Sequence, residues 1–350
     1  MVKVGIINVT GYAGSELARL LYIHPEAQLV SVTGRSAAGK PLAEVFPHLS
    51  CYDLTVEESL GEVDFVFSAL PHAASAGAIV PLVRQGLPVV DISADFRLKD
   101  AAEYSAWYGN QHPAPDLLGQ AVYGLTELNR DAVTAAKLIA NPGCYPTAAV
   151  LALAPAVKSA VITTDIIVDA KSGVSGAGRS LGLAYHYPEA NESVAAYSVD
   201  GHRHLPEIVQ ELAALWPAAE APQPPRPRVT FTPHLIPMTR GIFATCYAPL
   251  QPGALPSGEA GKAAARDLFR EAYRSEPFVK VVDAPPSTKQ TWGNNLCLIY
   301  PTVDLRTERL VVLSVIDNLV KGAAGQAIQN MNLMLGLPEA IGLDLPAVYP

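Results

Sequence analysis

The sequence predicts an α/β protein with a parallel sheet covered by helices, followed by an α+β part with a mixed, largely antiparallel sheet. The first half alternates short, almost wholly apolar runs with helical patterns, as βαβ units with a buried parallel sheet do. The second half has more apolar runs than helical stretches, which favours a mixed sheet with helices on one face. The 350 residues, 49% of them hydrophobic, suffice for two domains.

Each element follows from its local pattern. In the first half, strands are expected at residues 3–9, 28–34, 63–71, 89–97 and 138–141, with a helix at 15–24. In the second half, strands are expected at residues 161–171, 229–236, 241–248, 278–283, 295–300 and 310–316, with helices at 206–215 and 262–274. The tail, residues 318–335, is again helical and apolar enough to pack on the first domain. We therefore expect one domain at residues 1–145 with 318–350, and a second at 146–317.

Composition excludes several function classes. The formal charge is −8 without any basic run, which argues against nucleic-acid or polybasic membrane partners. No apolar stretch approaches the ~18–20 residues that span a bilayer. Lys3 leads directly into an apolar strand, so no signal peptide is expected. The four cysteines are far apart, which favours a reducing cytoplasm and no metal site. Residues 217–228 hold five prolines and are expected to form a surface loop.

The first motif, GIINVTGYAGS at residues 5–15, follows a strand and opens a helix. That context is typical of a Rossmann-type dinucleotide-binding turn, in which glycines let the backbone approach the pyrophosphate at a helix N-terminus. Asn8 replaces the first glycine of the series, and Asn tolerates left-handed backbone. A purely structural glycine turn is the alternative. The expected cofactor-binding residues are Thr10, Gly11, Tyr12, Ala13 and Gly14.

Cofactor choice depends on the end of the second strand. Sites for NAD usually place an acidic residue there, on the ribose 2′-hydroxyl. Here the strand ends in Gly34, Arg35 and Ser36. Arg35 and Ser36 suit a 2′-phosphate, which favours NADP. The alternative is that Arg35 is only a solvated surface residue.

The second motif, ANPGCYPTAAVL at residues 140–151, places Cys144 after an Asn-Pro-Gly turn. Pro146 fits only the first turn of a helix, so Cys144 lies at a helix N-terminus. That position favours the reactive thiolate and predicts a nucleophile. The alternative, an inert core thiol, is what we expect for Cys51, Cys246 and Cys297.

The third motif is YSVDGHRHLPE at residues 197–207. Pro206 marks a helix start, so His202 and His204 lie on the preceding loop. Beside a cysteine, an imidazole can handle a proton. Two residues apart on an extended loop, the two rings are expected to point in opposite directions, and His202 is slightly favoured as the acid/base. The alternative is a pair of surface histidines.

The fourth motif, KSGVSGAGR at residues 171–179, is a small-residue loop after an apolar strand. Its successive N–H groups are expected to form an anion nest with Arg179 as a charged clamp. A flexible linker is an equal alternative.

A nicotinamide beside a reactive cysteine suggests reduction of an activated acyl group through a thioester. The chain resembles the N-acetyl-γ-glutamyl-phosphate reductase family of the aspartate-semialdehyde dehydrogenase superfamily. The resemblance covers essentially the whole chain and rests on TGYAGSEL, ALPH, DISADFRL, VYGLTELNR, ANPGCYPTA, SGVSGAGR, GHRHLPEI and DNLVKGAAGQA. It implies that Cys144 is the nucleophile and that His202, His204, Glu207 and Tyr197 line the substrate site. The matched motifs also imply that Ser172, Gly173, Asn318 and Gly322 contact the cofactor.

The resemblance further implies reduction of N-acetyl-L-glutamyl 5-phosphate by NADPH in arginine biosynthesis, in a homo-dimer or tetramer. This small acyl-phosphate substrate carries a carboxylate and a phosphate, so at least two of four arginines are expected to converge on Cys144. They are Arg97, Arg179, Arg203 and Arg240; the alternative is that some only pair with neighbouring carboxylates. Three other functions stay open: an aminoadipyl-phosphate reductase of lysine biosynthesis, an NADP-binding redox sensor and a Cys-His hydrolase.

Overall fold

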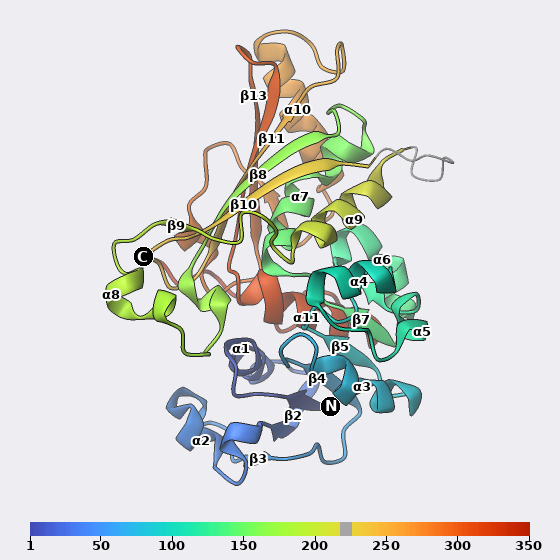
Figure 1. Cartoon of the computed structure of the whole chain (residues 1–350), viewed down its shortest axis with the longest axis vertical. Coiled ribbons are helices and arrows are strands. Elements are labelled where there is room, and N and C mark those ends of the chain that lie inside the picture. Colours follow the sequence, from blue (N-terminus) through green and yellow to red (C-terminus); the bar gives the residue numbers. More distant parts are fainter. Residues whose placement is uncertain (218–225) are drawn as a thin grey trace. The chain divides into compact units, whose positions relative to one another are not determined.

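The computed structural model describes residues 1–217 and 226–350, so most of the proline-rich segment 217–228, expected to be a surface loop, lies outside the described residues. The chain forms two compact units (Figure 1). The first unit comprises Met1–Gly143 and Gly322–Leu345, and the second comprises Cys144–Lys321 and Pro346–Pro350. Among the described residues, no helix is long and apolar enough to cross a membrane.

The first unit contains a seven-stranded, wholly parallel sheet in the order β3-β2-β1-β4-β5-β7-β6. Its strands are β1 Val2–Ile7, β2 Ala27–Thr33, β3 Val56–Glu57, β4 Phe65–Ser68, β5 Val89–Asp91, β6 Val122–Tyr123 and β7 Leu138–Ala140. Its helices are α1 Tyr12–Leu21, α2 Leu42–Val45, α3 Ser75–Arg84, α4 Ala101–Tyr108, α5 Pro115–Leu118, α6 Thr126–Ala135 and α11 Gly325–Met334. The predicted parallel α/β class is therefore confirmed, and the strand order reverses between β1 and β4, where such folds bind ligands.

Burial explains why this unit folds. Helices cover the sheet, so the apolar side chains of its strands are removed from water. Val66, Ile79, Val89, Phe96 and Leu138 belong to one buried cluster. Helix α11 packs on α1 and α6 within the first unit. The five predicted strands are present. Sequence patterns miss β3 and β6, because two residues carry no readable period.

The second unit contains a mixed sheet in the order β12-β13-β14-β11-β8-β10-β9. Its strands are β8 Asp165–Ser172, β9 Ala195–Ala196, β10 Arg228–Leu235, β11 Ile242–Pro249, β12 Val279–Val281, β13 Cys297–Asp304 and β14 Arg309–Ile316. Its helices are α7 Cys144–Lys158, α8 Tyr187–Ala190, α9 Leu205–Leu215 and α10 Glu259–Ala272. Among the described strand pairs of this sheet, only β8–β10 and β12–β13 are parallel, which confirms the predicted mixed, largely antiparallel sheet.

The two faces of this sheet differ in what covers them. Helices α7, α9 and α10 pack on one face (Figure 1), over buried residues such as Val168, Cys246 and Val312. Residues that alternate with these point to the opposite face. Ile167, Tyr247 and Val311 are register neighbours there and remain partly or fully exposed. Helix α7 is buried along almost its whole length, which explains its nearly continuous apolar sequence.

Candidate active site

The glycine-rich turn has the backbone that a dinucleotide site requires. Asn8 adopts φ 66°, the left-handed conformation expected from its place in the motif. Its amide Nδ2 donates to the Ala69 carbonyl at 2.8 Å, and its Oδ1 accepts from the Thr10 hydroxyl at 3.0 Å. A Cβ on Gly11, which precedes α1, would meet only Asn8 Nδ2, at 3.7 Å. The turn therefore leaves open the space at the start of α1 that a pyrophosphate needs.

The residues predicted to select NADP over NAD lie at the same edge of the sheet as the glycine-rich turn. Gly34 follows β2, and a Cβ on it would lie 2.6 Å from Thr10 Cγ2, so the end of β2 packs against the glycine turn. Arg35 and Ser36 begin the next short 3₁₀ helix and are exposed. Tyr12, Ala13 and Gly14 form the first turn of α1. These groups lie at the carboxyl ends of β1 and β2, the edge at which parallel α/β sheets bind dinucleotides.

A buried network fixes the chain immediately before Cys144. Asn141 is fully buried; its backbone N–H donates to the Asp91 carbonyl, and its side chain bonds with the Ala323 carbonyl and with Asn330. Arg97 is also buried, and its Nε donates to the Asn141 carbonyl at 2.8 Å. Cys144 itself is partly exposed and is the first residue of the 15-residue helix α7. The structure thus places the thiol at the start of a helix, as the sequence predicts.

The other three cysteines have different surroundings. Cys246 and Cys297 are buried, and burial raises the pKa of the Cys246 thiol to about 12, so it is unreactive. Cys51 is exposed, so the expectation that it fills the core is wrong; it lies in a turn region of the first unit.

In the second unit, five aromatic rings gather around the start of α7. Tyr145 packs edge-on against His202, His204 and Phe231, with ring centroids 5.7, 5.9 and 5.2 Å away. The Tyr197 hydroxyl donates to the Tyr145 hydroxyl at 3.1 Å, which in turn donates to the His234 carbonyl at 3.3 Å. Burial raises the pKa of Tyr197 above its usual range, and the adjacent Cys144 contributes. The histidine motif and the cysteine motif therefore meet in one aromatic cluster, made of Tyr145, Tyr197, His202, His204 and Phe231.

The two histidines do not point in opposite directions, so that expectation is wrong. Their ring centroids lie 4.8 Å apart, and both rings contact Tyr145. The reason is that His204 already has helical backbone as the residue before α9, so the loop is not extended. The His204 N–H donates to Nδ1 of His202 at 3.0 Å. Burial, and secondarily the charge of Arg203, lowers the pKa of His202 to about 4.

The four candidate arginines have different environments. Arg97 donates to the Ile92 and Asn141 carbonyls within the first unit, so it orders the turn before Cys144. Arg240 lies 3.4 Å from the buried carboxylate of Asp317. Arg179 and Arg203 are exposed. Glu207, in the first turn of α9, is buried. Convergence of at least two arginines on Cys144 stays a prediction.

The small-residue loop does not form the expected anion nest. The N–H groups of Gly173, Val174 and Ser175 donate to the carbonyls of Gly241, Met238 and Thr239. A Cβ on Gly173 would lie 2.7 Å from the Thr239 carbonyl oxygen, so the two loops pack in close contact. These three N–H groups are therefore occupied by backbone carbonyls, and Gly173 allows the two loops to pack closely.

The remaining residues predicted to bind the cofactor lie in or beside the two packed loops, or where the chain re-enters the first unit. The Ser172 hydroxyl donates to the Gly173 carbonyl. Asn318 accepts from the Gly241 N–H at 2.7 Å and donates to the Ser175 hydroxyl at 3.0 Å. Gly322 lies in a buried π-helical turn, Val320–Ala324, a feature frequent at functional sites. Their cofactor contacts stay predictions.

Two members of the aromatic cluster, Tyr145 and Phe231, are not predicted from the sequence. Tyr145 carries a readable signal, because it follows the nucleophile directly in the first turn of α7. Phe231 carries none, because it comes from β10, far away in the sequence. The parallel pairing of β10 with β8 positions it in the aromatic cluster, against Tyr145.

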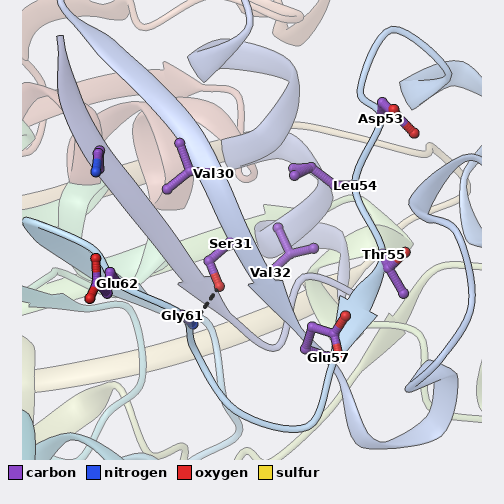
Figure 2. Close-up of a pocket in the computed structure, with 10 residues that line it drawn as sticks. Val30, Ser31, Val32, Asp53, Leu54, Thr55, Glu57, Gly61 and Glu62 are labelled. Atoms are coloured by element: carbon purple, nitrogen blue, oxygen red, sulfur yellow. Dashed lines mark hydrogen bonds between the residues drawn. The ribbon is translucent and has the colours of Figure 1, made fainter.

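A separate cavity of about 450 Å³ lies on the first unit, beside β2 and β3 (Figure 2). Ser31 on its wall accepts a hydrogen bond from the Gly61 N–H at 3.0 Å. Asp53, Glu57 and Glu62 line it, with Lys3 as the one basic residue of the lining. It contains none of the predicted site residues, and its negative lining disfavours an anionic dinucleotide.

Comparisons with known proteins cover the whole chain. Residues 3–136 match the family model "Semialdehyde dehydrogenase, NAD binding domain", and residues 144–318 match "Semialdehyde dehydrogenase, dimerisation domain". The chain is 54% identical to an N-acetyl-gamma-glutamyl-phosphate reductase of Dehalococcoides mccartyi, with 99% of both chains covered. It is 49% identical to the protein of that name from Heliobacterium modesticaldum, with both chains fully covered.

Solved structures share the fold. Aspartate semialdehyde dehydrogenase II from Vibrio cholerae superposes with a TM-score of 0.69 at 16% identity, covering 96% of this chain and 99% of that one. The Candida albicans aspartate semialdehyde dehydrogenase, solved with NADP, gives a TM-score of 0.66 at 19% identity, covering 97% and 99%.

Proposed function

The chain belongs to the semialdehyde dehydrogenase family of oxidoreductases, and we propose that it reduces N-acetyl-L-glutamyl 5-phosphate with NADPH. The products are N-acetyl-L-glutamate 5-semialdehyde and phosphate, in arginine biosynthesis. Full-length relatives at 46–54% identity carry the name of this reaction. The observation that carries the proposal is Cys144 at the start of α7, next to the aromatic cluster that contains Tyr145, Tyr197 and His202.

Cys144 supplies the nucleophile. The thiolate, favoured at the N-terminus of α7, attacks the acyl carbon, and the bond from that carbon to the phosphate oxygen breaks. The acyl group remains on Cys144 as a thioester. When bound, the dinucleotide supplies the hydride that reduces this thioester. Collapse of the reduced adduct re-forms the carbonyl, breaks the carbon–sulfur bond and returns the thiolate.

The turn at Asn8–Gly14 and the end of β2 fit the dinucleotide. The open face of Gly11 and the start of α1 suit its pyrophosphate. Arg35 and Ser36, exposed beside this turn, suit a 2′-phosphate, so we propose NADP rather than NAD.

We propose that the enzyme works as a homo-dimer or tetramer in the cytoplasm. The open face of the second sheet, which carries Ile167, Tyr247 and Val311, is the surface that supports assembly. The matched family model for this unit bears the name dimerisation domain. The four cysteines form no disulfide within the described part of the chain, which agrees with a reducing compartment.

One assay separates the proposed function from its alternatives. Purified protein is given NADPH with N-acetylglutamyl phosphate or with the aminoadipyl analogue presented on its carrier protein, while absorbance of NADPH and release of phosphate are followed. We expect equal amounts of NADPH oxidised and phosphate released with the glutamyl substrate. Turnover with only the aminoadipyl substrate would assign the lysine branch. NADP binding without turnover would assign a sensor, and phosphate release without oxidation a hydrolase.

A further inference from the structure

We propose that His202 acts in catalysis as a neutral hydrogen-bond donor through Nε2, and that the backbone N–H of His204 holds the ring in that tautomer. The inference rests on the proposed reduction and deepens it, because it assigns one histidine and one atom to the acyl oxygen. It also excludes His202 as the base that ionises Cys144.

The hydrogen bond to Nδ1 determines the tautomer. The His204 N–H donates to Nδ1 of His202 at 3.0 Å, so the Nδ1 lone pair is used. A neutral imidazole carries one proton, and with Nδ1 as acceptor that proton is on Nε2. Within the described part of the chain, this is the one hydrogen bond of the His202 ring, which leaves Nε2–H for a ligand. The ring is partly exposed, so a ligand can reach it.

The surroundings of the ring favour its neutral form. Tyr145, Tyr197 and Phe231 present their rings edge to face with His202, at centroid distances of 5.7, 5.4 and 5.3 Å. These walls remove water without supplying a carboxylate that would stabilise an imidazolium. The flanking Arg203 adds like-charge repulsion, and the burial described above acts in the same direction. A second proton on Nδ1 would also break the bond to the His204 N–H.

A neutral donor suits the oxygen of the reacting acyl group. Hydride addition to the thioester carbon converts the C=O π pair into an oxyanion while NADPH becomes NADP⁺. The oxyanion pair then re-forms C=O as the carbon–sulfur bond breaks, and sulfur leaves as thiolate. No proton is gained or lost in these two steps. A fixed N–H donor therefore stabilises the oxyanion without transferring its proton.

In this role His202 does not act as the base that deprotonates Cys144. A ring that already carries its proton on Nε2 and accepts at Nδ1 has no free basic nitrogen for the thiol. The thiolate is then stabilised by the N-terminus of α7, of which Cys144 is the first residue. Tyr145 and Tyr197, both hydrogen-bonded and with pKa raised by burial, stay protonated beside it.

The decisive experiment compares His202→Gln with His202→Leu. The amide nitrogen of Gln reaches the place of Nε2 and donates, but it transfers no proton, whereas Leu fills the space without a donor. We expect His202→Gln to retain kcat within about tenfold of wild type and His202→Leu to lose about 10²–10³-fold. Equal losses in both variants would overturn the proposal, and so would full activity of His202→Leu. NADPH binding measured in parallel confirms that each variant is folded.

A readout without turnover keeps the inference separate from the proposed function. In wild-type protein labelled with ¹⁵N-histidine, two-bond ¹H–¹⁵N spectra report the tautomer, and His202→Gln assigns the signal. We expect a neutral Nε2–H ring at pH 7. An Nδ1–H ring or an imidazolium would overturn the proposal even if the enzyme reduces its substrate. A correct tautomer in a protein that oxidises no NADPH would instead contradict the proposed function.

Discussion

The carbonyl oxygen of Asn8 lies 2.5 Å from the position that a Cβ on Gly14 would occupy. The backbone atoms of Val9 are almost as close, so the first turn of α1 packs directly on the left-handed turn after β1. Gly14 is therefore required by close packing, whereas a Cβ on Gly11 would enter only the open space proposed for the pyrophosphate.

Replacing Gly14 by Ala is expected to destabilise the protein by about 1–3 kcal/mol, because the backbone on both sides must move. It should also weaken NADPH binding. Gly77 in α3 is the matched control, since a Cβ there meets nothing within 4 Å, and Gly77→Ala should stabilise by about 0.5–1 kcal/mol. Denaturant unfolding and fluorescence titration with NADPH measure both effects. Equal stability of the two variants would contradict the packing argument.

Asn8 is expected to tolerate Gly better than Ala. Both changes remove the bond to the Ala69 carbonyl, but only Ala must hold a Cβ at φ 66°, which costs about 1–2 kcal/mol more. Unfolding free energies of Asn8→Gly and Asn8→Ala give this difference directly. If Ala is no worse than Gly, the left-handed turn does not persist in solution.

Arg35→Ala is expected to weaken NADPH binding about tenfold or more and to leave NADH binding unchanged. A charge-assisted bond to the 2′-phosphate, worth about 1.5–3 kcal/mol, is lost, and NADH has no such group. Dissociation constants for both cofactors in wild type and variant give the test. An equal loss of affinity for both cofactors would show that Arg35 supports the fold and does not bind the 2′-phosphate.

His24 is expected to make the protein less stable in acid. It is buried, it accepts the Glu26 and Ala27 N–H groups at Nδ1, and its Nε2 lies 2.9 Å from Asn332 Oδ1. Burial lowers its pKa below 6.5. The unfolded chain therefore binds the proton first, and stability falls as pH drops below 6.5. His24→Gln should flatten the dependence of unfolding free energy on pH between 7 and 5; an unchanged slope would contradict this.

The sequence predicts the longer elements and the nucleophile because those depend on local patterns. Apolar runs identify β1, β8 and β14, and the Asn-Pro-Gly turn identifies the start of α7 at Cys144. The predictions that fail concern structure that depends on residues remote in the sequence. The loop after β8 forms no nest because residues 238–241 supply carbonyl acceptors, and the histidine rings share one side because His204, the residue before α9, already has helical backbone. Phe231 joins the aromatic cluster through sheet pairing.

If Cys144 carries the acyl group, mass spectrometry of the protein mixed with N-acetylglutamyl phosphate in the absence of NADPH detects the thioester. We expect a mass increase of one N-acetylglutamyl group on the peptide that contains Cys144, and its loss as semialdehyde when NADPH is added. Cys144→Ser should bind NADPH, form no such adduct and lose turnover. An unmodified Cys144 in an enzyme that turns over, or a serine variant that keeps wild-type activity, would contradict the account.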